Sequence, residues 1–165
     1  MSSMSSEERL DSGIVRHVAT TCLCLHAHRA ARALGRLFDS ALRPHGLTNG
    51  QFSLLMALNR DVPPTIGQVA PFLAMDRTSL TAALKPLERR GLVQVGPGEK
   101  DRRSRVVTIT PAGIAALRAA LPTWAATQAR VDAALGDGMS EMLRAGLRPL
   151  PSALTARSQP DRTPE

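Results

Sequence analysis

The segment 65–110 constrains the fold of this chain more than any other, because two short helical patterns are followed at once by two strand patterns. The first helix is predicted to begin after Thr65, where Gln68 three residues on completes a capping box. The second begins after Asp76, whose carboxylate can accept hydrogen bonds from the free amides of a first helical turn. Gly91 permits the left-handed turn that ends it. Since only two residues separate the patterns, the segment predicts a helix-turn-helix.

The second helix of this pair has an apolar stripe and a polar face. Leu80, Leu84 and Leu87 recur at helical spacing, so they are predicted to face the core. The other side chains of its first turns are short polar groups or cations, which suit contacts with DNA base edges and phosphates. The side chains expected at a major groove are Arg77, Thr78, Ser79, Thr81 and Lys85. A change at Ser79 or Thr81 is expected to alter the preferred DNA sequence.

Two β-branched runs, 92–95 and 105–109, predict a hairpin in which Gly96-Pro97-Gly98 forms the turn. Residues 76–105 hold eight Lys or Arg and four Asp or Glu, which gives +4 of the formal net charge of +7. Cations on a hairpin arm can neutralise phosphates and enter a minor groove. The expected contacts of this wing are Lys100, Arg102, Arg103 and Arg105, with Asp101 forming an ion pair with Arg103.

Four motifs resemble those of one known family. Gly-Leu-Thr-x-x-Gln-Phe opens a helix at 46–52, with Thr48 and Gln51 as a second capping box, and Leu-Glu-Arg-Arg-Gly-Leu-Val lies at 87–93. Asp-x-Arg lies in the wing at 101–103, and Ile-Thr-Pro-Ala-Gly starts the next helix at 109–113, with Thr110 as its cap. Over about residues 18–135 the chain resembles the MarR family of bacterial winged-helix regulators. The resemblance implies a homodimeric repressor that binds a palindromic operator in double-stranded DNA and is released by a small aromatic or acyl ligand or by oxidation.

The expected fold class is mainly α with a small β-hairpin wing, in a single domain of residues 13–151. The winged helix-turn-helix is expected to occupy 48–110. Helices from both ends of the chain, 13–43 and 111–151, have apolar faces left over, which a second subunit would bury. They are therefore predicted to be the dimerisation helices.

Outside the winged helix, the patterns predict long helices and polar ends. One helix is predicted from about Ile14 to Leu42, and Pro122 is expected to kink the helix that follows the wing. A last helix is predicted over 139–150. Residues 1–12 are expected to form a flexible arm and 152–165 a disordered tail.

Composition restricts the function classes. A pI near 11.1 indicates a polyanionic partner. No apolar run reaches the length of a membrane span and no signal-peptide pattern follows the start, so we expect a cytoplasmic protein without a membrane partner. Two cysteines do not make a disulfide framework. No activated nucleophile, carboxylate pair, phosphate loop or complete metal set occurs at a usable spacing, so neither an enzyme nor a cofactor is expected.

A cluster of cysteines and histidines in the predicted first helix is the candidate sensor. On a helix, Cys22 lies beside His26 and Cys24 beside His28, on faces about 200° apart, so one metal ion cannot collect all four within one chain. Three interpretations stay open. The cysteines are packed in a helix interface, or they are redox-sensing thiols near cations such as Arg29, or they help to bind zinc or copper with a partner chain.

The position of Cys24 resembles the first-helix cysteine of the peroxide-sensing OhrR branch of this family. Those sensors look to hold their thiolate with tyrosine hydroxyls, and this chain contains no tyrosine, so the peroxide chemistry is not carried over. The family resemblance also implies a ligand pocket between the dimer helices and the DNA lobe, with candidate residues His17, Cys24, His28, Gln51 and Met56. Two alternatives to this reading are a non-specific architectural DNA-binding protein and a metal-responsive regulator.

Overall fold

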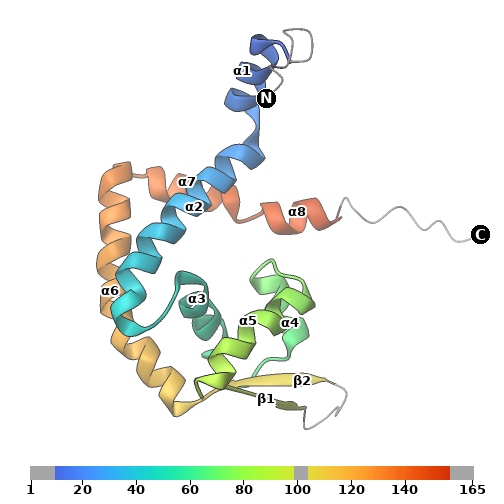
Figure 1. Ribbon diagram of the computed structural model, residues 1–165, viewed down its shortest axis with the longest axis vertical. Helices are drawn as coiled ribbons and strands as arrows, with labels where there is room; N and C mark the ends of the chain where they lie inside the picture. Colours follow the sequence, from blue (N-terminus) through green and yellow to red (C-terminus); the bar gives the residue numbers. More distant parts are fainter. Residues whose placement is uncertain (1–9, 99–103, 157–165) are drawn as a thin grey trace, which may run out of the picture. The chain divides into compact units, whose positions relative to one another are not determined.

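The computed structural model describes residues 10–98 and 104–156, which are mostly helical with one two-stranded antiparallel sheet (Figure 1). This confirms the expected fold class. The chain divides into two compact units, Met1–Leu37 and Phe38–Glu165. The domain boundaries expected from the sequence, with one domain over 13–151, stay a prediction.

The first unit contains α1 (Ser12–Thr21) and most of α2 (Leu23–Leu42). The second contains the end of α2 and then η2 (Arg43–His45), α3 (Asn49–Leu58), α4 (Ile66–Phe72), α5 (Arg77–Arg89), β1 (Val93–Pro97), β2 (Arg105–Ile109), α6 (Pro111–Leu135), α7 (Met139–Leu147) and α8 (Leu150–Ala156).

The prediction of one helix from Ile14 to Leu42 is wrong, because the helix breaks at Cys22, whose ψ of 102° is extended. Local polar side chains explain the break. The hydroxyl of Thr21 donates to the carbonyl oxygen of His17 at 2.8 Å, and Nε2 of His26 lies 3.3 Å from the carbonyl oxygen of Thr20. Such side chains compete with the backbone for helical partners.

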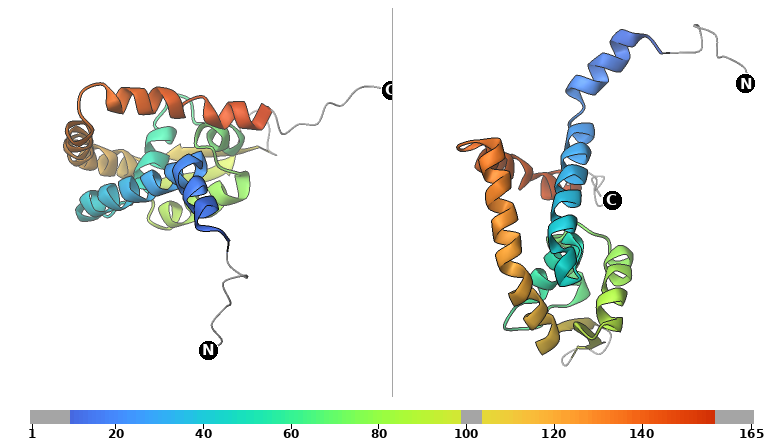
Figure 2. Two further views of the ribbon diagram at one scale, coloured as in Figure 1. Left: turned by 90° about the horizontal axis from the view of Figure 1, so that it is seen from above. Right: turned by 60° about the vertical axis from the view of Figure 1, so that its left-hand side comes forward.

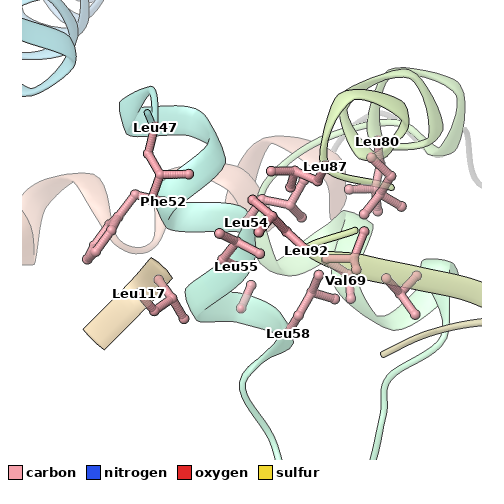
Figure 3. Close-up of a cluster of buried hydrophobic side chains, with 14 of the residues drawn as sticks. Leu47, Phe52, Leu54, Leu55, Leu58, Val69, Leu80, Leu87, Leu92 and Leu117 are labelled. Carbon is pink, nitrogen blue, oxygen red and sulfur yellow. The ribbon is translucent and has the colours of Figure 1, made fainter. Parts of the chain in front are cut away.

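Helix α3 supplies the centre of the core of the second unit. Leu55 and Leu58 are fully buried, and the stripe predicted on α5, Leu80, Leu84 and Leu87, is buried as well. Figure 3 shows Leu55, Leu58, Leu80 and Leu87 in one cluster with Val69 of α4, with Leu92, and with Leu117 of α6. The core thereby fixes α3, α4, α5 and the start of α6 against one another.

Three side-chain caps form where the sequence predicts them. Oγ1 of Thr48 accepts from the amide of Gln51 at 3.2 Å, and Oγ1 of Thr65 accepts from the amide of Gln68 at 3.3 Å. In return, the side-chain oxygen of each glutamine accepts from the backbone amide of its threonine. The third cap is Asp76, at the start of α5. Helices α4 and α5 pack side by side (Figure 2).

The hairpin is longer than predicted. Gly96 and Pro97 were expected in the turn, but they pair with Val106 and Arg105 as the last residues of β1. In the described residues β1 pairs with β2 alone, so a proline without an amide is tolerated at its free edge. The other side of β2 is tied to the start of α4, because the amide of Val107 donates to the carbonyl oxygen of Pro64 at 2.9 Å.

Helix α6 starts as expected, with Thr110 as its cap, and Pro122 lies in its interior. Figure 1 shows α6 changing direction between its gold and orange parts, which fits the kink expected from an interior proline. No helix in the described ranges has both the length and the apolar character needed to cross a bilayer.

Both predicted chain ends need correction. The last helix expected over 139–150 ends at Leu147, and a further helix, α8, begins at Leu150 and includes residues 152–156 of the predicted disordered tail. At the other end, Ser12 already lies in α1, whose first turn is capped by Asp11. The rest of the arm and of the tail, 1–9 and 157–165, lies outside the described residues.

Candidate functional site

The carboxylate of Asp76 fixes the N-terminus of α5. Its Oδ1 accepts from the amide of Ser79 at 2.8 Å, and its Oδ2 accepts from the hydroxyl of Ser79 at 2.6 Å. These bonds favour the charged carboxylate, so they hold the pKa of Asp76 below its ordinary value. The cap therefore uses the hydroxyl of Ser79, a residue that the sequence placed among the DNA contacts.

The solvent face of α5 carries the remaining predicted DNA contacts. Arg77, Thr78, Thr81 and Lys85 are all exposed. Together with Ala82 they line a shallow hollow of about 320 Å³. The hydroxyl of Thr81 donates back to the carbonyl oxygen of Arg77 at 2.7 Å, so only its acceptor side and its methyl group remain available. The structure thus brings four predicted residues together on one open, basic surface.

A second hollow of about 320 Å³ lies between α4, α5 and the end of the hairpin nearest its tip. It is lined by Thr65, Ile66, Gly67, Arg77, Thr81, Ser104 and Arg105. The guanidinium of Arg77 lies over Gly67, only 3.3 Å from where a Cβ would stand, so any larger residue at position 67 would crowd it. With Arg77 and Arg105 on its walls, this basic notch suits a phosphate group.

The tip of the wing lies outside the described residues, and with it Lys100, Arg102, Arg103 and the expected ion pair between Asp101 and Arg103. The strands of the wing are described, and Arg105 is exposed at the start of β2, next to the tip. These wing contacts stay predictions.

An apolar pocket of about 350 Å³ lies between α3, α4 and α6. It is lined by Phe52, Ser53, Met56, Ala57, Phe72, Leu73, Leu121 and Trp124. The rings of Phe52 and Trp124 stack with centroids 5.9 Å apart, and the guanidinium of Arg60 lies 5.3 Å from the centroid of Phe72. Ser53 and Trp124 are the lining side chains that carry a polar N–H or O–H group, and no lining side chain is charged.

Of the pocket residues expected from the sequence, the structure places only Met56 in this wall. Gln51 does not line it, because its side-chain oxygen accepts from the amide of Thr48 at 3.1 Å as part of the α3 cap. His17, Cys24 and His28 belong to the first unit. The apolar spacing of α3 was visible in the sequence, but the contribution of α4 and α6 depends on tertiary packing.

The candidate sensor residues surround the break between α1 and α2. Sγ of Cys24 lies 3.8 Å from Nδ1 of His28, as the helical spacing predicts, and both residues are exposed. Among the described residues no hydrogen bond joins the side chains of Cys22 and His26: Sγ of Cys22 accepts from the amide of Leu25 at 3.4 Å, and Nε2 of His26 lies 3.3 Å from the carbonyl oxygen of Thr20. In residues 10–98 and 104–156, no three Cys, His, Asp or Glu side chains gather as metal ligands would.

Comparison with known proteins agrees with this geometry. Residues 45–104 match the model of the MarR family. The crystal structure of the M. tuberculosis transcriptional regulator MosR in complex with DNA is 39% identical, with a TM-score of 0.75 over 84% of this chain and 99% of that one. The chain belongs to the MarR family.

Curated relatives of this MarR-family protein are transcription regulators, not enzymes. The transcriptional activatory protein BadR of Rhodopseudomonas palustris is 36% identical over 94 residues, or 55% of this chain and 54% of BadR. The organic hydroperoxide resistance transcriptional regulator of Bacillus subtilis is 26% identical over 91 residues, or 55% of this chain and 62% of that one. The similarity therefore spans between half and two thirds of these relatives.

Some residues of the site were missed by sequence reasoning. Ala82 lines the hollow on α5, and its position opposite Leu80 and Leu84 could have been read from the helical period. Nothing in the sequence marked Gly67 as part of the site, since the space it leaves matters only because the guanidinium of Arg77 lies over it. Arg90 was counted among the eight cations of residues 76–105. Its guanidinium donates to the carbonyl oxygen of Gly46 at 2.8 Å, so it ties the end of α5 to the segment before α3.

Proposed function

We propose that this protein is a homodimeric MarR-type repressor that binds a palindromic operator in double-stranded DNA and is released by a small effector. The observation that carries the proposal is the open basic surface formed by α5 and the start of β2. Arg77, Lys85 and Arg105 are exposed on it. A helix N-terminus with such side chains can enter a major groove while the arginines neutralise phosphates.

Unburied apolar side chains support the homodimer. On α7, Met142, Leu143 and Leu147 are 67%, 46% and 49% exposed, and on α1 the side chains of Ile14 and Val15 are 52% and 55% exposed. Apolar groups in such number favour burial against a second copy of the chain. A two-fold dimer would present two copies of α5 to successive major grooves, about 34 Å apart.

Gel shift with duplex DNA tests the DNA-binding part of the proposal. A duplex from upstream of the protein's own gene should be bound more tightly than a scrambled duplex of equal length. Binding should weaken as salt rises, because counterions compete for the phosphates. Equal affinity for both duplexes would favour the alternative, a non-specific architectural DNA-binding protein.

The apolar pocket between α3, α4 and α6 supports release by a small aromatic ligand. Phe72 and Leu73 in its wall stand at the end of α4, just before the short turn into α5. A ligand that displaces them would shift the start of α5, the helix that carries the proposed DNA contacts. Since the lining offers the hydroxyl of Ser53 and the indole N–H of Trp124 but no cation, an uncharged aromatic compound fits better than a carboxylate, whose burial without a charged partner is costly.

Trp124 offers a direct test of the pocket, because it is the one tryptophan of the chain and lies in the pocket wall. Titration with benzyl alcohol should change its fluorescence and release DNA at the same concentrations, and benzoate should act less strongly. The substitution Met56→Trp should fill the pocket and prevent the release of DNA by benzyl alcohol while DNA binding persists, as measured by gel shift. Unchanged release by benzyl alcohol in Met56→Trp would place the effector elsewhere.

Oxidation is a second route to release, favoured by the exposed pair of Cys24 and His28. A mild oxidant followed by dithiothreitol should release and restore DNA binding, and Cys22→Ser or Cys24→Ser should abolish the response if that residue senses. Release that persists in both variants would show that neither cysteine is the sensor and would leave them a packing role alone. A metal-responsive regulator would instead be released or recruited by added zinc or copper in the absence of oxidant.

A further inference from the structure

The outward face of α5 is a single row of side chains. Successive residues of an α-helix turn by 100°, so Thr78, Ala82 and Lys85 lie opposite the buried stripe of Leu80, Leu84 and Leu87. All three are exposed and line the same hollow. They are the side chains that meet the floor of a groove if α5 enters it with its buried stripe facing the protein.

The hydroxyl groups of α5 are not equally free. The hydroxyl of Ser79 donates to Oδ2 of Asp76 at 2.6 Å, and that of Thr81 donates to the carbonyl oxygen of Arg77 at 2.7 Å. Among the described residues, the hydroxyl of Thr78 has no intramolecular partner. It therefore keeps both its donor and its acceptor capacity for an outside group.

We propose that Thr78, Ala82 and Lys85 form the base-reading strip of this protein and that Ser79 serves the helix cap instead. The proposal rests on the proposed function, since it concerns how the same surface reads DNA. It replaces the expectation that Ser79 sets the preferred sequence.

Each member of the base-reading strip has a defined chemistry toward a base edge. A threonine hydroxyl can donate to or accept from a base, an alanine methyl group packs against the methyl group of thymine, and a lysine donates to O6 and N7 of guanine. The strip therefore fits half-sites that present a thymine to Ala82 and a guanine to Lys85. Arg77 lies to one side, on the wall of the notch beside Gly67, where it suits a phosphate.

Selection from a pool of randomised duplexes tests the strip, with the full-length protein and three variants. Thr78→Val keeps the shape of the side chain and removes its hydroxyl, and Lys85→Met removes the charge from a chain of similar length. Each should lose about tenfold in discrimination at one base pair of each half-site. The matched control is Ser79→Ala, which removes a hydroxyl one residue away and should lower the thermal stability while leaving the selected sequence unchanged.

The outcomes separate the two proposals. A parent protein that selects no sequence overturns the proposed function and the base-reading strip together. A parent that selects an inverted repeat, with the same sequence selected by Thr78→Val and Lys85→Met, overturns the strip alone. A changed sequence in Ser79→Ala would also overturn it, because the hydroxyl assigned to the cap would then be reading a base.

Discussion

Asp76 shows how one residue links helix stability to pH. Its two carboxylate oxygens hold the amide and the hydroxyl of Ser79, and its pKa lies below the ordinary value for this reason. The charged form is therefore the one that the folded state favours. The stabilisation is present above the ordinary value and is lost as the pH falls through the lowered pKa.

Asp76→Asn separates this titration from the cap itself, because asparagine caps a helix as well as aspartate but carries no charge. The parent protein should lose thermal stability as the pH falls from neutral to below 3.8, and Asp76→Asn should lose less over the same range. The pKa of Asp132 is also lowered, by Ser140, Gln128 and Arg144, so part of the acid sensitivity should remain in the variant. Identical melting curves for both proteins at every pH would contradict this account of the cap.

Arg105 is expected to contact DNA phosphates. It is exposed at the start of β2 and lines the basic notch with Arg77. Arg105→Ala should weaken binding to all duplexes to a similar extent and lower the slope of log affinity against log salt by about 1. The matched control is Arg118→Ala, an exposed arginine of α6 that lines neither hollow of the site, and its slope should equal that of the parent. An unchanged slope in Arg105→Ala would remove this residue from the interface.

At the scale of the elements, the winged helix depends on close packing where the hairpin leads into α6. Gly113 lies in the first turn of α6, and a Cβ added there would collide with the carbonyl oxygen of Leu92 and lie 2.8 Å from Cγ1 of Ile109. The hydroxyl of Thr110 donates to the carbonyl oxygen of Gly91 at 2.7 Å across the same junction. The Thr-Pro-Ala-Gly motif therefore joins the end of α5, both strands and α6.

Gly113→Ala should lower the free energy of unfolding by about 1–3 kcal/mol, because the backbone must shift to admit the methyl group. Gly50→Ala is the matched control in the first turn of α3, where a Cβ would meet nothing closer than Oγ1 of Thr48 at 4.0 Å. That variant should be as stable as the parent or gain roughly 0.5–1 kcal/mol. Denaturant unfolding measures both, and equal stability of the two variants would contradict the packing described here.

Features that depend on side chains only a few residues apart could be predicted from the sequence. The caps at Thr48, Thr65 and Asp76 and the stripe on α5 need no knowledge of the rest of the fold, and all of them form. The break at Cys22 could not be seen, since no proline or glycine marks it and its cause is a set of side-chain hydrogen bonds. In the site, the helical period predicted which side chains of α5 are exposed. It could not predict that the hydroxyl of Ser79 donates to Asp76.

At the scale of the whole molecule, the two kinds of surface have different tasks. The basic surface of α5 and the start of β2 suits a polyanion, whereas the apolar side chains of α1 and α7 suit a second copy of the chain. A specific regulator needs both, because one copy of α5 reads too few base pairs and two copies, held by a dimer, read two half-sites. The symmetry of the proposed dimer should therefore appear in its operator.

Footprinting on the DNA upstream of the protein's own gene tests this claim most directly. The account predicts one protected region that contains an inverted repeat, with half-site centres about one helical turn or a multiple of it apart. Protection should appear at both half-sites over the same range of protein concentration. Even protection along the whole fragment, with no preferred site, would contradict the account and identify a protein that coats DNA without reading it.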